Sequence, residues 1–318
     1  MEVTFWGTRG SIPSPMGAGE VRSKVRAALG KAVESGLGPE SDIDEFMDRS
    51  LPFSGRATYG ANTSCIEIRD GKSFVLCDAG TGLRSFGNQV MGRPPAERPG
   101  EFHIFLSHLH WDHIQGFPFF VPGLIPGNRV IFYGCHPDLE KAFSAQHSFP
   151  FFPIEFHQLG AEIRFETLTP GREMEVQGFK VTPIRQNHPG ASFGYRFERG
   201  DKTVVYSTDS EHKDESGDEL SSFIAFFNDA DLLIFDAQYT FVDACTSKEN
   251  WGHSNNLIGV ELAHEAGVKH LVLLHHDPNN TDGQLDQLLE DTRKLAELLA
   301  DGEAVEVTVA WDGLVVRI

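Results

Sequence analysis

Short apolar or alternating runs recur along the chain, and most of them end at glycine, asparagine, aspartate or proline. Runs such as VTFWG, SFVLCDAG, FHIFLSH, DLLIFDA and HLVLLHH have the length and the β-branched and aromatic content of β-strands, and the final run EVTVAWDGLVVRI is also expected to form a strand. Other segments, such as LDQLLEDTRKLAELLA, place apolar residues three or four positions apart, which is typical of amphipathic helices. Many strands with helices between and after them predict a layered α/β protein.

One segment, about residues 14–59, is too long for a tight connection between two strands. It separates the strand-turn FWGTRGSIP from the strand NTSCIEIRD, and it contains an expected helix over Glu20–Ser35 and a shorter one near Ile43–Arg49. Connections in compact domains usually span a few residues, so this length favours a lid, a substrate wall or a subunit contact. We predict a single domain over residues 1–318 that carries this helical insertion.

The run FLSHLHWDHIQGF holds three histidines and an aspartate within six consecutive positions. FHIFLS alternates like a strand and DHIQGF can open a helix, which places the polar residues on the turn between them. His108 and His110 are two residues apart on an extended turn and can bind one ion, while Asp112 and His113 can face a second. Imidazole and carboxylate ligands suit zinc or manganese and require no sulfur. The alternative is a chance cluster on a polar loop, but HxHxDH is far more specific than a lone histidine.

A site for two ions needs more ligands than one turn supplies, and further polar residues follow later strands. His188 comes directly after the strand in PIRQNHPG, and Asp209 ends the strand VVYSTD. His275 and His276 follow the apolar run LVLL. These positions fit the tendency of functional residues to lie on loops at strand ends.

The SHLHWDH run and the ordered residues after it resemble the metallo-β-lactamase superfamily. The resemblance implies an α/β fold, the four-layer αββα sandwich of that superfamily, with a dinuclear metal centre. It assigns His108, His110 and His188 to one ion, Asp112, His113 and His275 to the other, and Asp209 to a bridging position between them.

The likeness runs nearly end to end and favours one branch of the superfamily. VTFWGTRGSIP and NTSCIEIRDGKSFVLCDAGTGLR are similar to the opening of ribonuclease Z-like and cyclic-nucleotide phosphodiesterase-like members. The resemblance implies that Asp78 orients a ligand histidine through a hydrogen bond without binding the metal itself. From the sequence alone, a structural role for Asp78 as a cap of the turn is equally plausible. His275 is the expected ligand of its pair because it directly follows the apolar strand, and His276 is expected to support the ligands from behind.

A further pair of polar residues lies in DLLIFDAQYTFVDACTSKENWGHSNN. Asp236 ends a strand, and His253 lies in a Gly-His-Ser turn. Ribonuclease Z-like enzymes carry a glutamate and a histidine at the matching places, where the pair helps to protonate the leaving oxygen. The resemblance therefore implies that Asp236 and His253 are catalytic, together with the ligand Asp112, although an aspartate has a shorter reach than a glutamate. The alternative for His253 is a satisfied loop histidine.

Composition limits where in the cell the protein is expected and which classes of partner it can bind. The chain has 46 acidic and 27 basic residues and a formal net charge of −19, and it contains no basic block that would hold a long phosphate backbone. Four widely spaced cysteines without a CxxC pair predict reduced thiols rather than a disulfide framework or a thiolate zinc site. The N-terminus does not resemble a signal peptide and no run of about 18 apolar residues is present, so the cytoplasm is expected and a membrane is not.

These features predict a metal-dependent hydrolase, first of all a phosphodiesterase that acts on a small or cyclic nucleotide through a hydroxide bridging the two ions. The stretch CHPDLEKAFSAQHSFPFFPIEFHQLG is rich in phenylalanine where relatives that process transfer RNA extend a basic arm, and HHDPNNTD departs from their serine-containing turn. Both departures disfavour transfer RNA. A ribonuclease Z-like endonuclease for RNA 3′ ends is the alternative, and a non-hydrolytic metal-binding or cofactor-biosynthesis protein on the same fold is a third interpretation.

The resemblance implies two divalent metal ions as cofactors. Zinc is the first expectation, with manganese or iron as alternatives, because nitrogen and oxygen ligands accept all three. The expected partner is a small phosphodiester or cyclic nucleotide. A homodimer is a further expectation from the family, with the insertion at about residues 14–59 as the candidate contact.

Overall fold

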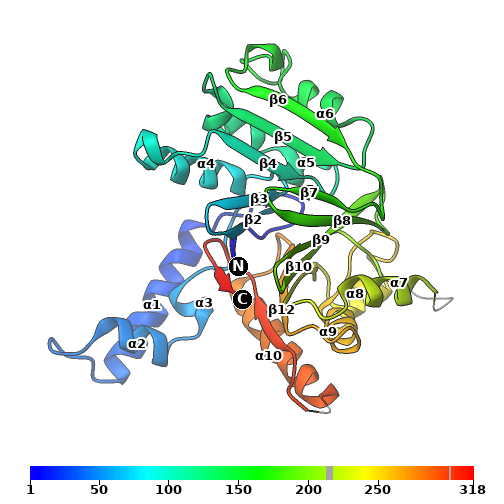
Figure 1. Cartoon of the computed structure of the whole chain (residues 1–318). Coiled ribbons are helices and arrows are strands. Elements are labelled where there is room, and N and C mark those ends of the chain that lie inside the picture. The colour runs from blue at the N-terminus through cyan, green and yellow to red at the C-terminus, as the bar shows by residue number, and fades with distance from the viewer. Residues whose placement is uncertain (213–217, 301) are drawn as a thin grey trace.

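Two β-sheets lie face to face in the body of the protein (Figure 1). This computed structural model describes residues 1–212, 218–300 and 302–318. Within those residues the strands form two seven-stranded sheets, one from β1–β6 with the last strand of the chain and one from β7–β13.

Each sheet can be followed from one edge strand to the other. The first sheet contains β14 (Val315–Arg317), β1 (Glu2–Gly7), β2 (Cys65–Asp70), β3 (Ser73–Cys77), β4 (Glu101–Phe105), β5 (Arg129–Gly134) and β6 (Glu162–Thr167). The second contains β13 (Glu306–Val309), β12 (His270–Leu274), β11 (Leu232–Asp236), β10 (Lys202–Ser207), β9 (Ser192–Arg199), β8 (Phe179–Gln186) and β7 (Met174–Val176). Both sheets are mixed, with β3 to β6 and β10 to β13 pairing in parallel.

Helices cover the outer face of each sheet, as parallel strands require. Against the first sheet pack α4 (Gly82–Gly92), α5 (Trp111–Ile114) and α6 (Leu139–Gln146), with the short helices η1 (Pro95–Glu97), η2 (Phe117–Phe119), η3 (Val121–Leu124) and η4 (Phe156–Gln158) nearby. Against the second pack α7 (Asp218–Phe227), α9 (Asn256–Glu265) and α10 (Asp282–Leu299), and α8 (Phe241–Cys245) lies in the loop after β11.

The main apolar core lies between the two sheets. Phe5 and Ile66 of the first sheet and Tyr195, Phe197 and Val204 of the second are all buried in one cluster. Two further clusters join each sheet to its own helices. The expected α/β fold, a four-layer αββα sandwich, is confirmed.

The C-terminal run EVTVAWDGLVVRI, which we expected to be one strand, is divided between the two sheets. β13 extends the second sheet beside β12, and β14 pairs with β1 of the first. The chain turns between them at Gly313, which has φ +95°, and the Gly313 N–H donates to the Phe5 carbonyl over 2.7 Å. A glycine in this left-handed conformation lets the chain cross from one sheet to the other.

The segment between β1 and β2 carries three helices, α1 (Ala18–Glu34), α2 (Ile43–Ser50) and α3 (Phe53–Arg56). Helices α1 and α2 project from the body as an arm, residues 18–50 (Figure 1). Neither contains a buried residue. In the described part of the chain, no helix has both the length and the apolar character needed to cross a bilayer.

Candidate metal centre

The register of the parallel strands brings the candidate residues to one edge of the sandwich. In the first sheet Cys77 pairs with Phe105, so the chain leaves β3 and β4 at the same level. In the second sheet Ser207 pairs with Phe235, and Asp236 pairs with Leu274. The residues that follow these strands, among them Asp78, His108, Asp209 and His275, therefore meet between the two sheets.

Three of these residues have backbone conformations that L-amino acids rarely adopt. The φ angles are 61° for Asp78, 49° for Asp209 and 63° for His275. Such conformations cost free energy and recur where function requires a particular side-chain direction. Here each one turns a polar side chain inward immediately after a strand.

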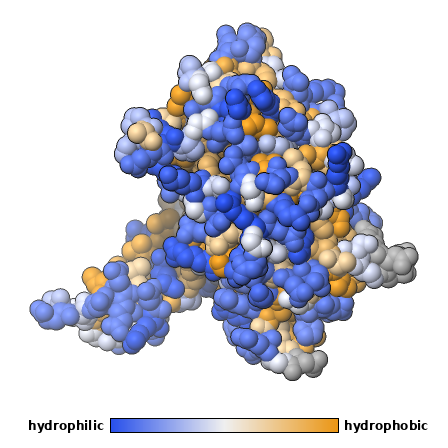
Figure 2. Space-filling view, viewed as in Figure 1, coloured by the Kyte–Doolittle hydropathy of each residue, from blue (hydrophilic) through white to orange (hydrophobic). Residues whose placement is uncertain are grey.

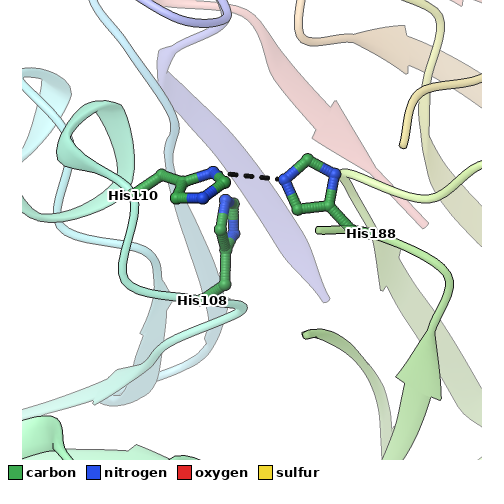
Figure 3. A group of neighbouring side chains, drawn as sticks. All are labelled: His108, His110 and His188. Carbon is green, nitrogen blue, oxygen red and sulfur yellow. Dashed lines mark hydrogen bonds between the residues drawn. The ribbon is translucent and has the colours of Figure 1, made fainter. Parts of the chain in front are cut away.

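The first triad consists of His108, His110 and His188, each of which offers one nitrogen within 4.8 Å of the others (Figure 3). His188 Nε2 lies 3.2 Å from His110 Nδ1. His108 Nε2 is buried and has no hydrogen-bond partner in the part of the chain that the structure describes. A buried polar atom without a partner destabilises the folded state, so this nitrogen is suited to bind a cation.

The second triad consists of Asp112, His113 and His275. His275 Nε2 lies 3.2 Å from Asp112 Oδ2 and 3.2 Å from His113 Nε2. His113 Nε2 lies 3.3 Å from the same Asp112 oxygen. All three side chains are buried.

Asp209 lies between the triads and turns one oxygen to each. Its Oδ1 lies 3.3 Å from His113 Nε2 and 3.2 Å from His275 Nε2. Its Oδ2 lies 3.5 Å from His108 Nε2 and 3.7 Å from His188 Nε2. The structure thus brings together all seven side chains that the sequence nominated as ligands.

Hydrogen bonds at Nδ1 fix the ring orientation of three of these histidines. His113 Nδ1 lies 2.7 Å from Asp78 Oδ2, His188 Nδ1 lies 2.8 Å from the Gly252 carbonyl, and His275 Nδ1 lies 3.0 Å from Gln238 Oε1. Because these partners accept hydrogen bonds, we assign the proton to Nδ1, which leaves the Nε2 lone pairs facing one another. Converging lone pairs beside carboxylates fit divalent cations of the zinc, manganese or iron type.

The protonation of the site follows from burial and from its carboxylates. Burial lowers the pKa of His108 well below its usual value and also lowers the pKa of His188, so both rings are neutral. Burial opposes ionisation of Asp209, but His275, His113 and His108 together hold the pKa of that carboxyl well below its usual range. The first triad therefore places two neutral imidazoles beside an ionised carboxylate.

Around His113, negative charge is concentrated. Burial disfavours the charged ring, but Asp209, Asp112 and Asp78 outweigh it and raise the pKa of His113 well above its usual value. Three carboxylates facing one ring attract positive charge, which a bound cation supplies as well as a proton does.

His253 and Asp236 form a pair next to both triads. His253 Nδ1 lies 2.8 Å from Asp236 Oδ2, and the Gln238 N–H donates to the other Asp236 oxygen over 3.0 Å. The His253 ring stacks on His275, with centroids 5.1 Å apart, and meets His188 edge-on at 5.0 Å. Burial opposes protonation, but the Asp236 carboxylate raises the pKa of His253 to about 9.

A family match covers most of this framework. Residues 74–276 match the family described as Beta-lactamase superfamily domain. This range begins in β3 and ends just after His275, so it includes all seven candidate ligands. The chain belongs to the beta-lactamase superfamily.

Two curated relatives in the superfamily cover most of the chain. The probable metallo-hydrolase YhfI of Bacillus subtilis is 29% identical over 270 residues, which span 83% of this chain and 96% of that protein. Ribonuclease Z of Methanosarcina acetivorans is 27% identical over 300 residues, which span 78% of this chain and 90% of the relative. These matches support a hydrolase and leave its substrate unresolved.

Solved structures share the superfamily fold over the whole chain. A diphosphatase from the PhnP family aligns with a TM-score of 0.59 and 18% identity over 100% of this chain and 97% of its own. Zn(2+)-bound PqqB from Methylobacterium extorquens aligns with a TM-score of 0.64 and 18% identity over 100% of both chains. At this identity the likeness shows the fold alone.

His276, the other member of its pair, does not turn its ring into the cluster. The ring is buried, its Nε2 donates to the Ala310 carbonyl over 2.8 Å, and it meets Tyr59 edge-on. Its backbone N–H and carbonyl bond to Thr8 and Gly10. Any support that His276 gives to the ligands passes through its backbone. Its carbonyl accepts from the Gly10 N–H, and Gly10 lies against the His275 ring.

Several residues of this superfamily site were not singled out from the sequence. The Ser11 N–H donates to Asp112 Oδ2 over 2.7 Å, and Gln238 accepts from His275. The Ser107 and Tyr206 hydroxyls both donate to Asp78 Oδ2. A search for polar residues within two positions of each strand end would have nominated Gln238 and Ser107.

The triads open into a cleft of about 470 Å³. It is lined by Ser11, Leu109, His110, Trp111, Asp112, Asp209, His253 and His275. None of these lining residues is a lysine or an arginine, so the described cleft offers no fixed cation of its own apart from protonated histidine.

Proposed function

We propose that this protein is a metal-dependent phosphodiesterase that hydrolyses a small or cyclic nucleotide. The observation that carries the proposal is the position of Asp209, which turns one oxygen to each of two triads with the His253–Asp236 pair beside them. Two cation sites that share one carboxylate suit attack on phosphorus, because charge builds up on several oxygens at once.

The triads would hold two divalent ions, one at His108, His110 and His188 and one at Asp112, His113 and His275, with Asp209 shared. When bound, such ions supply Lewis-acid stabilisation of charge on the phosphoryl oxygens and lower the pKa of a water molecule to make it a nucleophile. Zinc is the metal we propose first, since the fit is to imidazole and carboxylate ligands and PqqB, a structural neighbour, binds Zn²⁺.

His253 would act as the general acid. Its Nδ1–H donates to Asp236, which fixes the ring and favours the charged imidazolium. The Nε2–H of that imidazolium is then free to donate its proton to the departing alkoxide as the P–O bond breaks. Asp236 would position the ring and stabilise its charge. Although an aspartate is shorter than a glutamate, its Oδ2 lies within hydrogen-bond distance of His253 Nδ1, at 2.8 Å.

The named activities of two matched proteins support phosphorus as the reacting centre. One relative is a ribonuclease and one structural neighbour is a diphosphatase. A pure metal-binding protein has no use for an acid pair beside its ions, so the Asp236–His253 contact also disfavours a non-hydrolytic function.

A small substrate is favoured over RNA by charge. The chain carries a formal charge of −19, and residues 135–160 contain one lysine and no arginine. In that segment the loop between α6 and η4 exposes Phe149 and Phe151, which offer nothing to a phosphate backbone. Ribonuclease Z-like processing stays the second candidate because relatives of that name align over most of the chain.

The test is a substrate panel with protein purified in the presence of zinc or manganese. Hydrolysis of cyclic AMP or bis(p-nitrophenyl) phosphate that is lost in H110A supports the proposal. Cleavage of precursor transfer RNA alone would support the ribonuclease. Stoichiometric metal without turnover of any phosphodiester would contradict both.

A further inference from the structure

Trp111 lies at the mouth of the cleft with its indole in solvent. It is the first residue of α5, and its side chain is 81% exposed although it lines the cleft beside His110 and Asp112. An exposed tryptophan forgoes a large gain from burial. A flat, uncovered ring next to the reacting groups therefore indicates a ligand that covers it.

The backbone that carries this indole is fixed. The Trp111 carbonyl accepts from the Gln115 N–H over 2.7 Å, and the His110 carbonyl accepts from the His113 N–H over 3.0 Å. Since His110 and Asp112 flank Trp111 and both enter the triads, the ring stands at a set distance from the metal centre. Such a platform is preorganised for stacking.

The charges of the cleft restrict what can stack there. Its lining contains two carboxylates, Asp112 and Asp209, and no lysine or arginine among the described residues. The ammonium of Lys248 lies 3.8 Å from the centre of the Trp251 ring and 5.6 Å from that of Tyr239, which contacts His253. Lys248 is not among the residues that line the cleft. Beyond the two ions, a second or third phosphate would meet no fixed cation.

We infer that Trp111 stacks on the base of a nucleotide whose single phosphodiester reacts at the metal centre. The inference rests on the proposed function and narrows its substrate class to monoanionic diesters that carry a nucleobase, such as cyclic mononucleotides. Stacking of a base on an aromatic side chain is sequence-tolerant, so purine and pyrimidine substrates should both gain from it.

The experiment compares cyclic AMP with its abasic analogue, the 3′,5′-cyclic phosphate of 1-deoxyribose, in wild type, W111A and W111F with equal metal content. We expect W111A to raise the KM for cyclic AMP about tenfold with little change in kcat, because alanine removes the base-stacking surface. W111F should recover most of the loss, and the preference for cyclic AMP over the abasic diester should shrink in W111A.

Equal losses on both diesters in W111A, or no loss on cyclic AMP, would overturn the stacking inference alone. Calorimetric binding of the same two diesters separates it from the proposed function. If wild type binds cyclic AMP more tightly than the abasic diester but hydrolyses neither, the phosphodiesterase proposal fails and stacking stands. If it binds both equally, stacking fails whatever the turnover.

A second, independent observation concerns the arm formed by α1 and α2. Its helices contain no buried residue, and the exposed apolar side chains include Val25 at 53% and Leu29 at 62%. Figure 2 shows hydrophobic surface along this arm. A groove of about 530 Å³ between the helices is lined by Val21, Val25, Leu29, Ile43, Phe46 and Met47. Apolar surface of this kind marks a contact site.

The charges beside the groove identify the occupant. On α1, Arg22 and Arg26 are one helical turn apart, and on α2, Asp44 and Asp48 are one turn apart. All four are exposed, and only Asp48 has an ion-pair partner among the described residues, Arg56. In a two-fold contact, the basic helix of one copy meets the acidic helix of the other.

A homodimer with this insertion as its contact is already an expectation from the family; we propose that its interface pairs the arm of one copy with the arm of the other. The apolar stripes would cover one another, and the α1 arginines would face the partner's α2 carboxylates. An anionic bilayer is disfavoured as the occupant because the acidic helix flanks the same groove and the whole chain carries a charge of −19.

Sedimentation velocity tests the pairing. Wild type should be a dimer, while V25E/L29E, R22E/R26E and D44R/D48R should each shift toward monomer with turnover retained, since the arm lies outside the cleft. The variant with both charge reversals in one chain should regain the dimer. A monomeric wild type, no recovery in that combined variant, or sedimentation of wild type with phosphatidylserine vesicles would overturn the proposal.

Discussion

Asp78 is fully buried, and its carboxylate accepts four hydrogen bonds. The donors are the Ser107 N–H and hydroxyl, both at 2.8 Å, the His113 ring at 2.7 Å and the Tyr206 hydroxyl at 2.6 Å. Three of these donors converge on Oδ2, and only the Ser107 N–H meets Oδ1. Asp78 thus sets the tautomer of His113 and also joins the first sheet to the second through Tyr206.

We therefore expect D78N to weaken metal affinity by about 10- to 100-fold, because an amide has a single acceptor oxygen, so either the donors at Oδ2, His113 among them, or the Ser107 N–H would face an NH2 group. Competition with a chelator measures the affinity. Y206F is the matched control, since it removes one donor but leaves the Asp78–His113 bond, and it should lose far less. Equal affinity in D78N and wild type would leave Asp78 as a turn residue only.

For His253, the leaving group offers the sharpest test. A p-nitrophenolate departs without a proton, whereas the ribose alkoxide of a cyclic nucleotide needs one. We expect H253A to reduce kcat on cyclic AMP by about 10²- to 10⁴-fold and to affect a p-nitrophenyl diester much less. D236A should show the same pattern more weakly. Uniform losses on both substrates would assign His253 to metal binding instead of acid catalysis.

His212 is buried and enclosed by Phe223 and Phe235, and neither of its ring nitrogens has a hydrogen-bond partner among the described residues. Burial, opposed by Asp236, lowers the pKa of His212 from 6.5 to about 4. Folding thus favours the neutral ring, and this contribution is complete above pH 6.5 and is lost as pH falls from 6.5 toward about 4.

We expect H212F to gain about 2 kcal/mol of unfolding free energy relative to wild type at about pH 5, and almost nothing at about pH 7.5. Denaturant unfolding at both pH values measures the difference. H157Q, which removes an exposed histidine, should leave the pH dependence unchanged. A constant difference between H212F and wild type would mean that His212 is protonated or solvated in the folded state.

Most of the candidate site was accessible to sequence reasoning because its residues follow strands in a dense local motif or as single polar residues after apolar runs. His108, His110 and His188 are of this kind. Ser11 and Tyr206 were not accessible, because their contacts with Asp112 and Asp78 join segments 101 and 128 residues apart and depend on how the sheets face each other. The direction of the His276 ring was hidden for the same reason.

At the scale of elements, the loops after the strands hold the site through their backbone as well as their side chains. Gly252 has φ +82° and its carbonyl accepts from His188. A Cβ at this position would lie 2.4 Å from His188 Nδ1. The glycine in the Gly-His-Ser turn is therefore required both by its φ and by the approach of a ligand ring.

We expect G252A to displace His188 and His253 together and to reduce turnover by about tenfold or more, because backbone strain and contact both oppose the substitution. G30A on α1 is the matched control, since nothing lies within 4 Å of its added Cβ. Steady-state kinetics and metal content are the readouts. Full activity in G252A would show that the loop adapts and that its position is not critical.

The expected elements were right where hydrophobic periodicity was clear. The helix expected at Glu20–Ser35 is observed at Ala18–Glu34, and the one near Ile43–Arg49 at Ile43–Ser50. β6 was missed because EIRFET alternates with charged residues and is largely exposed at the edge of its sheet. The final run was expected to be one strand because periodicity does not report a change of sheet.

For the whole molecule, the two sheets serve to bring distant segments to one edge. The seven candidate ligands span residues 108–275, and their convergence follows from parallel strands that end at the same level. The superfamily could be read from the sequence because the ligand order is fixed by this framework. The substrate could not, since it depends on the cleft and its rim, which vary without disturbing the core.

Metal content tests the central claim most directly. Protein purified without chelators and supplied with zinc or manganese should retain about two equivalents per chain after gel filtration, measured by inductively coupled plasma mass spectrometry, because two triads share Asp209. Retention of no transition metal under these conditions would contradict the account, since the converging lone pairs would then have another explanation.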